Sequence, residues 1–262
     1  MSERNILLSF DVEEFDMPLE YGQNISIQEQ LAIGKKGLDS ILPILTDSAI
    51  QTTLFTTANF ADHYPDTIRY LSEKHEIASH TYYHSSFSHG DLAKSKDRLE
   101  MITGHRIYGL RMPRMQKADI QTLREAGYKY DSSIHPTWIP GRYNNLHLPR
   151  TLYIENEIVR LPASVSPKLR IPFFWLMFKN CPLSIFMQLA RKTLKNDGYI
   201  CLYFHPWEFT DLAHYQLPLF TKRWSKDILL DRLLKMINDL KKEGDFISMN
   251  DYINKKVPVI NT

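Results

Sequence analysis

Cysteine is scarce in this chain, since its 262 residues hold only Cys181 and Cys201. Two cysteines are too few for the disulfide framework of a small exported protein, and Cys201 stands in an apolar run where a buried thiol is expected. The start, Met-Ser-Glu-Arg-Asn, leads into an apolar run that is too short for the core of a signal peptide. The sequence therefore predicts reduced thiols in a cytoplasmic protein.

An excess of one charge is also lacking. The 32 Lys and Arg residues nearly balance the 30 Asp and Glu residues, which gives a net charge of +2. Because the basic residues are spread along the chain and form no stripe, nothing predicts binding to nucleic acid. With 43% hydrophobic and 24% charged residues, the composition is that of a globular protein, and the length fits a single domain over residues 1–262.

No apolar run is long enough to cross a bilayer as a helix. The most apolar segment, residues 171–190, is interrupted by Lys179, Asn180 and Pro182, so it does not predict a transmembrane span. Two interpretations remain for this segment. It is either a core-facing loop and helix, or a lid, an oligomer surface or a patch that touches lipid, and peripheral contact with a membrane stays open.

Short apolar runs alternate with segments of helical period, which predicts an α/β protein with parallel strands joined by crossover helices. Strands are expected at 6–10, 51–57, 76–79, 107–111, 129–134, 157–162, 199–204 and 245–249. Helices are expected at 28–47, 59–74, 91–103, 117–127, 183–196 and 226–242. Seven or eight such units favour a closed β/α barrel.

Two histidines, His80 and His84, are four residues apart, a spacing that brings two imidazoles onto one face of a helix. Among ten histidines such a pair also arises by chance. An acidic cluster, Asp11-Val-Glu13-Glu14, directly follows the first expected strand. Two imidazoles and one carboxylate are the open three-ligand set of a catalytic zinc, so the two features together indicate a metal site.

Polar residues also fall at or just past the ends of several expected strands: Asp11, His80, Arg111, Asp131 and His205. Each has an ordinary alternative as a turn cap, a surface ion pair or a loop residue. Together they predict a site, because the catalytic groups of β/α barrels gather at the C-terminal ends of the strands.

These residues lie in five ordered motifs that resemble those of the polysaccharide deacetylases of carbohydrate esterase family 4. The motifs are Ser9-Phe-Asp11, His80-Thr-Tyr-Tyr-His84, Gly109-Leu-Arg111-Met-Pro113, Tyr128-Lys-Tyr-Asp131-Ser-Ser and Tyr203-Phe-His205-Pro-Trp-Glu208. The Asp-Val-Glu and His-Pro-Trp-Glu variants look like the branch often found near bacterial surface-polysaccharide genes. The resemblance implies a deformed (β/α)7 barrel that removes an acetyl group from an N-acetylated sugar.

The resemblance also implies a role for each motif residue. His80, His84 and an acid of the first motif would hold one divalent metal, usually zinc, which activates a water for attack on the acetamide carbonyl. Asp11 would be the general base, held ionised and oriented by Arg111. His205 would be the general acid, oriented by Asp131. A backbone N–H after Pro113, that of Arg114, would bind the oxyanion.

Two departures from the family pattern are visible. Val12 stands where the second of two adjacent aspartates is usual, so the third metal ligand is Glu13 or Glu14. We favour Glu13, which lies on the same side as Asp11 in an extended stretch. Arg114 follows Pro113 where an aromatic residue is usual, and it either meets a phosphate or carboxylate of the substrate or is simply solvated.

Aromatic residues near the motifs are candidates for stacking against a sugar ring. Trp138, in a proline-rich loop, and Tyr83 are the candidates for the substrate site, whereas core packing is expected for Trp207. Three functions stay open. The leading one is a metal-dependent carbohydrate deacetylase, the second is a C–N hydrolase acting on a small cyclic amide or ureide, and the third is a metal-free carbohydrate-binding relative.

Overall fold

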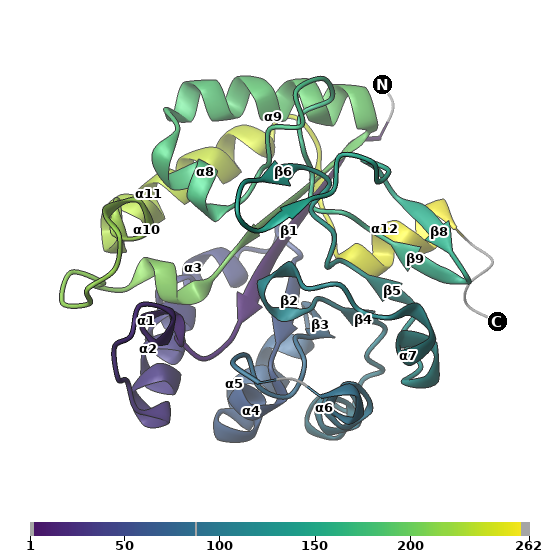
Figure 1. Ribbon diagram of the computed structural model, residues 1–262. Helices are drawn as coiled ribbons and strands as arrows, with labels where there is room; N and C mark the ends of the chain where they lie inside the picture. The colour runs from purple at the N-terminus through teal and green to yellow at the C-terminus, as the bar shows by residue number, and fades with distance from the viewer. Residues whose placement is uncertain (1–2, 87, 258–262) are drawn as a thin grey trace.

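The computed structural model describes residues 3–86 and 88–257, in which a curled sheet is covered on its outer side by helices (Figure 1). The strands are β1 (Asn5–Val12), β2 (Thr53–Thr56), β3 (Glu76–Ser79), β4 (Gly109–Leu110), β5 (Tyr130–Asp131), β6 (Trp138–Ile139), β7 (Tyr143–Asn144), β8 (Tyr153–Glu155), β9 (Ile158–Arg160), β10 (Tyr199–Phe204) and β11 (Asp245–Phe246). The α-helices are α1 (Met17–Glu20), α2 (Ile27–Ser40), α3 (Leu42–Leu45), α4 (Ala58–His63), α5 (Pro65–Ser72), α6 (His89–Thr103), α7 (Ile120–Glu125), α8 (Trp175–Asn180), α9 (Leu183–Asp197), α10 (Leu219–Lys222), α11 (Lys226–Leu240) and α12 (Met249–Lys256). Two short 3-10 helices are η1 (Pro113–Met115) and η2 (Pro206–Phe209).

The main sheet is a deformed β/α barrel. Seven strands pair in parallel in the order β10, β1, β2, β3, β4, β5 and β9, and β8 adds an antiparallel partner to β9. The deformation lies between β9 and β10, where an irregular segment makes the connection. Ser164 N–H donates to the carbonyl of Cys201 at 3.0 Å, and Cys201 N–H donates to Ser164 Oγ at 2.8 Å. The fold is therefore the one that the family resemblance implies.

Alternation along β1 separates an outer face from an interior face. Ile6, Leu8 and Phe10 belong to the hydrophobic cluster beneath the surrounding helices, whereas Leu7 belongs to a second cluster inside the barrel. Because side chains alternate along a strand, Leu7 and Asp11 lie on the interior side. From Leu7 through Ser9 to Asp11 the interior row becomes polar toward the C-terminal end, which is where the motif residues lie.

Helix α12 packs against the bottom of the barrel. Its residues Met249, Tyr252 and Ile253 join the interior cluster with Leu7 and Tyr130. The sequence pattern gave no expectation of this helix. Helix α12 thus closes the bottom of the barrel, and the motif residues lie at the opposite end.

All eight expected strands are present, although β2, β4, β5, β9 and β11 are shorter than expected, and the short strands β6, β7 and β8 were not expected. Two expected helices are each divided into two shorter helices, and in both cases a proline lies in the first turn of the second one. Pro65 is the first residue of α5, and Pro43 is the second residue of α3. A proline lacks the N–H that a continuous helix needs and is tolerated in a first turn. The expected boundaries at 28–47 and 59–74 were wrong for this reason.

The apolar segment 171–190 mostly faces the core. Phe173 and Phe178 are fully buried, and Lys179 is buried with them while its ammonium donates to the carbonyl of Thr221 at 2.8 Å. Among the described residues, no helix is both long enough and apolar enough to cross a membrane.

Candidate metal and catalytic site

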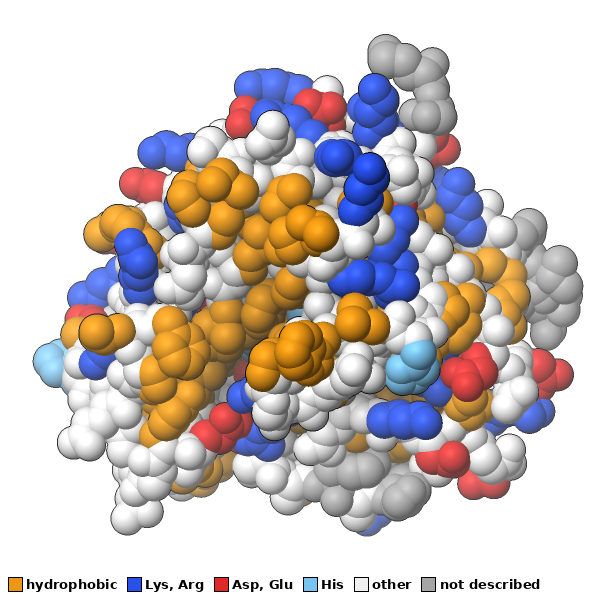
Figure 2. All heavy atoms as spheres, turned by 45° about the horizontal axis from the view of Figure 1, so that its top comes forward, with side chains coloured by type: hydrophobic (Ala, Val, Ile, Leu, Met, Phe, Trp, Pro, Cys, Tyr) orange, Lys and Arg blue, Asp and Glu red, His pale blue; other side chains and the backbone are white. Residues whose placement is uncertain are grey.

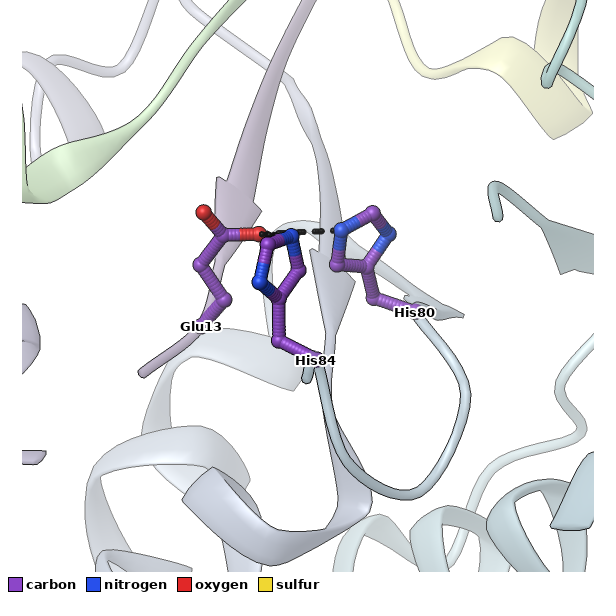
Figure 3. A group of neighbouring side chains, drawn as sticks. All are labelled: Glu13, His80 and His84. Atoms are coloured by element: carbon purple, nitrogen blue, oxygen red, sulfur yellow. Dashed lines mark ion pairs between the residues drawn. The ribbon is translucent and has the colours of Figure 1, made fainter. Parts of the chain in front are cut away.

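Glu13, His80 and His84 converge at the C-terminal end of the barrel, and their side chains point toward one another (Figure 3). Glu13 Oε2 lies 2.9 Å from His80 Nε2 and 3.1 Å from His84 Nε2. All three side chains are buried. The group has the composition and spacing of a three-ligand metal site, and it contains the glutamate that the sequence favoured.

Each of these three side chains is held through its other polar atom. His80 Nδ1 lies 2.7 Å from the carbonyl oxygen of Arg111, and His84 Nδ1 lies 2.8 Å from a carboxylate oxygen of Asp16. Because a carbonyl accepts a proton, His80 carries hydrogen on Nδ1 and turns Nε2 toward Glu13, whereas His84 faces a carboxylate through each of its two nitrogens. Trp207 Nε1 donates to Glu13 Oε1 at 2.9 Å. Glu13 Oε2, His80 Nε2 and His84 Nε2 are thereby directed to one point.

The two histidines come from a loop and not from a helix. His80 directly follows β3, and the backbone turns at Thr81, whose φ is +65°. Backbone N–H groups of Ala58 and Asn59 at the start of α4 donate to the carbonyls of Thr81 and Tyr82, both at 3.0 Å. The helical face expected from the four-residue spacing was wrong, because this loop is pinned to α4 and returns His84 to the side of His80.

The charges of the cluster are strongly coupled. Burial alone would raise the pKa of Glu13, but the imidazoles of His84, His205 and His80 outweigh it, so the pKa lies below its ordinary value. Burial alone would lower the pKa of His84, but the carboxylates of Glu13 and Asp16 outweigh it and raise the pKa to about 9. At neutral pH Glu13 is thus favoured as the anion that a metal ligand requires, and His84 as the imidazolium, so a metal that binds here displaces a proton from His84.

Glu14 points away from this cluster. Its carboxylate accepts a hydrogen bond from Thr57 Oγ1 at 2.8 Å and another from the side-chain amide of Asn59. Burial is the main cause of its raised pKa. Glu14 therefore braces the start of α4, and the structure places Glu13, not Glu14, with the two histidines.

Asp11 and Arg111 form a buried ion pair beside the cluster. Arg111 Nη1 donates to Asp11 Oδ1 at 2.6 Å and to Ser9 Oγ at 3.0 Å. The guanidinium is fully buried, and its carbon lies 4.1 Å from the centre of the Phe55 ring. A planar guanidinium held on several sides fixes the orientation of the carboxylate. The pair expected from the sequence is thus present.

His205 is held by a residue other than the one expected. Its Nδ1 lies 3.1 Å from Glu208 Oε1, and Glu208 Oε2 lies 3.4 Å from the buried Nζ of Lys179. The other ring nitrogen, Nε2, faces Asp11 Oδ2 at 3.8 Å. Burial alone would lower the pKa of His205, but the carboxylates of Glu13, Glu208 and Asp11 outweigh it and raise the pKa. The ring also stacks on Trp207, with centroids 4.9 Å apart.

Asp131 does not orient His205, which corrects the expectation from the sequence. The Asp131 carboxylate pairs with Arg160 of the neighbouring strand β9 and accepts hydrogen bonds from the N–H and hydroxyl of Ser133. Burial is the main cause of its raised pKa. Asp131 therefore joins β5 to β9 below the site, and Glu208 has the position next to the His205 ring.

A cavity of about 290 Å³ opens above these groups. Asp11, Glu13, His80, His84 and His205 lie at its polar end, and most of the other lining residues are apolar, namely Met17, Met115, Ile139, Pro140, Phe174, Trp175, Leu176, Tyr203, Trp207 and Phe220. The cavity is large enough for about one sugar unit with a polar anchor at one end.

The expected substrate-contacting residues are only partly at this cavity. Arg114 lines it, but its guanidinium is paired with Asp16 at 2.9 Å and with Glu20 at 2.5 Å. Trp138 is 60% exposed and Tyr83 is 43% exposed, and neither lines the cavity. The loop turns Ile139 and Pro140 toward the cavity in place of Trp138, and contact of Trp138 or Tyr83 with a substrate stays a prediction.

Three residues of the site were not assigned to it from the sequence: Asp16, Trp207 and Glu208. Trp207 was expected in the core, and it is buried, but its indole also bonds Glu13. Glu208 was noted only as part of the His-Pro-Trp-Glu variant. The feature of the sequence that could have assigned both residues to the site is their position just after His205, in the short 3-10 helix that His205 caps.

Comparison with known proteins agrees with this geometry. A family model described as polysaccharide deacetylase matches residues 2–130. None of the curated proteins matches the chain in sequence.

Solved structures share the fold. A protein of Mycobacterium smegmatis assigned as a polysaccharide deacetylase is 18% identical, with a TM-score of 0.66 over 98% of this chain and 91% of the other. A protein of Pseudomonas aeruginosa PAO1 with the same assignment is 15% identical, with a TM-score of 0.64 over 97% and 92% of the two chains. Puue allantoinase is 17% identical, with a TM-score of 0.62 over 97% and 91%.

Proposed function

Since this chain belongs to the polysaccharide deacetylase family, we propose that it is a metal-dependent hydrolase that removes the acetyl group from an N-acetylated sugar. We further propose that it acts in the biosynthesis of a bacterial surface polysaccharide and in the cytoplasm. The observation that carries the metal dependence is the convergence of three ligand atoms, Glu13 Oε2, His80 Nε2 and His84 Nε2.

The donor set fits zinc. Two imidazole nitrogens and one carboxylate oxygen are a common set for catalytic zinc, and each ligand here is oriented through its second polar atom by Arg111, Asp16 or Trp207. Such outer contacts are typical of metal ligands and are unnecessary for a chance cluster of buried side chains. When bound, a divalent metal supplies Lewis acidity to the acetamide carbonyl and to the attacking water.

Asp11 is the proposed general base. Its Oδ1 is engaged by Arg111, which leaves Oδ2 on the side of the cavity toward His205. A carboxylate held in one orientation beside the metal cluster is suited to take a proton from the attacking water. Arg111 lies beneath it, fully buried, and acts by positioning that carboxylate.

His205 is the proposed general acid. Its Nε2 faces the cavity, while Nδ1 is held by Glu208. A raised pKa favours the protonated imidazole, which is the form that donates a proton to the leaving amine. Glu208 then stabilises the imidazolium and fixes the ring, and Lys179 holds Glu208 in place. In this proposal Glu208 replaces Asp131 as the orienting residue.

The substrate's sugar would lie in the cavity above these groups. Of the residues predicted to contact it, Arg114 keeps that proposed role, since Arg114 lines the cavity. The oxyanion contact to the backbone N–H of Arg114 also stays a prediction. The alternative function is hydrolysis of a small cyclic amide or ureide, since allantoinase has a similar fold. A screen of both substrate classes distinguishes the two functions.

The decisive experiment measures metal content and turnover of the same preparations. We expect about one zinc per chain in the wild type, loss of zinc in His80→Ala and Glu13→Ala, and retention in Glu14→Ala, because only Glu14 faces away from the cluster. Zinc-loaded protein should release acetate from N-acetylated sugars, and a chelator should stop it. Absence of metal after zinc is supplied, or equal loss in both glutamate variants, would contradict the proposal.

A further inference from the structure

Four large apolar side chains are exposed on α10, on the turn that follows it and in the first turn of α11. The exposed fractions are 80% for Leu219, 50% for Phe220, 42% for Trp224 and 58% for Ile228. We call these four residues the α10 patch. Single exposed apolar side chains are ordinary, but a group of this size on one short stretch is typical of a surface that contacts another apolar phase.

The backbone of the turn holds Trp224 outward at a cost. Trp224 and Lys226 have φ values of +53° and +52°, a left-handed conformation that is unfavourable for residues other than glycine. Each such residue costs on the order of 1 kcal/mol. The guanidinium of Arg223 lies 5.4 Å from the Trp224 ring, so a cation accompanies the exposed indole.

The α10 patch is continuous with the catalytic cavity. Phe220 lines that cavity together with its neighbour Thr221, and Phe220 also lines a second, outer hollow of about 530 Å³. The outer hollow is completed by Leu219, Asn180 and two cations, Lys222 and Arg223. Figure 2 shows hydrophobic side chains on both sides of a hollow that crosses this face, with Lys and Arg around its margins.

The charge around the patch is positive. Residues 219–228 contain Lys222, Arg223 and Lys226 but a single acid, Asp227. Lys226 is paired with Asp211 at 2.5 Å, and Lys222 Nζ donates to the carbonyl oxygen of Tyr215 at 3.0 Å. Arg223 is exposed beside the Trp224 ring, so its guanidinium is the cation that faces outward. Apolar side chains with a tryptophan and adjacent cations are the composition that binds an interface between anionic head groups and acyl chains.

We propose that the α10 patch docks on the surface of an anionic lipid bilayer. A symmetric dimer through this patch would bring the positively charged surface of one copy against the same surface of the other, which opposes that arrangement. Docking by the patch would set the mouth of the catalytic cavity beside the lipid head groups. If the proposed function holds, the N-acetylated sugar is then presented at a membrane surface.

The test is co-sedimentation with vesicles, and it needs no turnover. Full-length protein is mixed with phosphatidylglycerol vesicles or with phosphatidylcholine vesicles, at low salt. We expect the wild type to sediment with the anionic vesicles, and Leu219→Asp/Ile228→Asp to bind them about tenfold more weakly or worse. Leu219→Asp alone, at the most exposed of these positions, is the second variant.

The matched control is Tyr70→Asp/Met101→Asp. It makes the same change in net charge at two exposed apolar positions on α5 and α6, 59% and 72% exposed, away from α10 (Figure 1). We expect it to bind vesicles as the wild type does. Thermal melting and zinc content show that each variant is folded.

Three results would overturn the proposal. The wild type could stay in the supernatant with anionic vesicles. The control variant could lose binding as fully as the patch variant, which would assign the effect to net charge alone. Sedimentation velocity could show that Leu219→Asp/Ile228→Asp converts a dimer to a monomer while vesicle binding is unchanged, which would assign the patch to a second copy. None of these results depends on catalysis, so the proposed function is tested separately.

Discussion

Trp207 Nε1 donates a hydrogen bond to Glu13 Oε1 at 2.9 Å, across 194 residues of sequence. The same indole stacks on the His205 ring, with centroids 4.9 Å apart and planes 23° from parallel. One side chain therefore orients both a proposed metal ligand and the proposed general acid. Trp207, a buried residue of the core, thus also fixes the position of Glu13 relative to His205.

Replacing this indole should weaken metal binding. In Trp207→Phe the ring stacking is kept, but Glu13 Oε1 loses its donor, so we expect the zinc affinity to fall about tenfold. Competition with a chromophoric chelator measures the affinity. Trp224→Phe, a change at an exposed tryptophan far along the chain from the ligands, is the control and should bind zinc as the wild type does. Equal affinities in both variants would exclude the orienting role.

Glu208 and Asp131 should differ sharply in their effects on turnover. Glu208→Gln removes the carboxylate that holds the His205 ring, so we expect kcat to fall about 100-fold with zinc content and KM little changed. Asp131→Asn breaks a buried pair with Arg160. We expect it to lower the free energy of unfolding by about 3 kcal/mol, with kcat of the folded protein within a few-fold of wild type.

Steady-state kinetics well below the melting temperature, together with urea unfolding, separate these two effects. A large loss of kcat in Asp131→Asn with Glu208→Gln unaffected would restore the assignment expected from the sequence. It would also mean that the contact between His205 and Glu208 has no part in catalysis.

Asp11→Asn should uncouple metal binding from turnover. The amide cannot accept a proton from the attacking water, so we expect kcat to fall at least about 100-fold. Zinc should stay bound, because Asp11 is not among the three converging ligands. Elemental analysis and acetate release are measured on one preparation, with His80→Ala as the control that loses both. Full activity in Asp11→Asn would contradict the assignment of the base.

Glu76, which lies at the opposite end of the barrel from the site, should make the free energy of unfolding depend on pH. Burial raises the pKa of Glu76 to about 7, against hydrogen bonds from Thr53, Asn250 and Tyr130 that lower it. The folded chain therefore keeps a proton that the unfolded chain releases near pH 4.5. The stabilisation is complete below the unfolded pKa and is lost as the pH rises through about 7.

Urea unfolding at pH 5 and pH 8 measures this effect. We expect the wild type to lose on the order of 2 kcal/mol of unfolding free energy over this interval through Glu76. Glu76→Gln does not titrate, so its unfolding free energy should change less. An identical loss in the variant would assign the pH dependence to other groups.

Much of the site could be predicted from the sequence because the relevant rules are local. Alternation along a strand puts Asp11 on the interior side and Glu13 two positions further on the same side, which is how Glu13 was preferred to Glu14. The ends of parallel strands lie at one rim, so Arg111 and His205 were expected near Asp11, and the structure places them there.

The remaining features depended on contacts between distant segments. His80 and His84 were expected on a helix, but hydrogen bonds to the start of α4 hold them in a loop. Spacing alone cannot distinguish the two, since a loop that folds back also brings residues four apart together. Trp138 was expected at the cavity for its residue type, and its orientation was decided by a loop whose course no local rule fixes.

The sequence by itself determined the eight expected strands, which side of β1 carries its acids, and the residue types at the rim, because strand period and chain order are properties of neighbouring residues. The tertiary structure alone decided the partner of His205. Asp131 had a second candidate partner, Arg160, that the pairing of β5 with β9 brings close. A buried carboxylate pairs with the nearest guanidinium, and only the three-dimensional register shows which one that is.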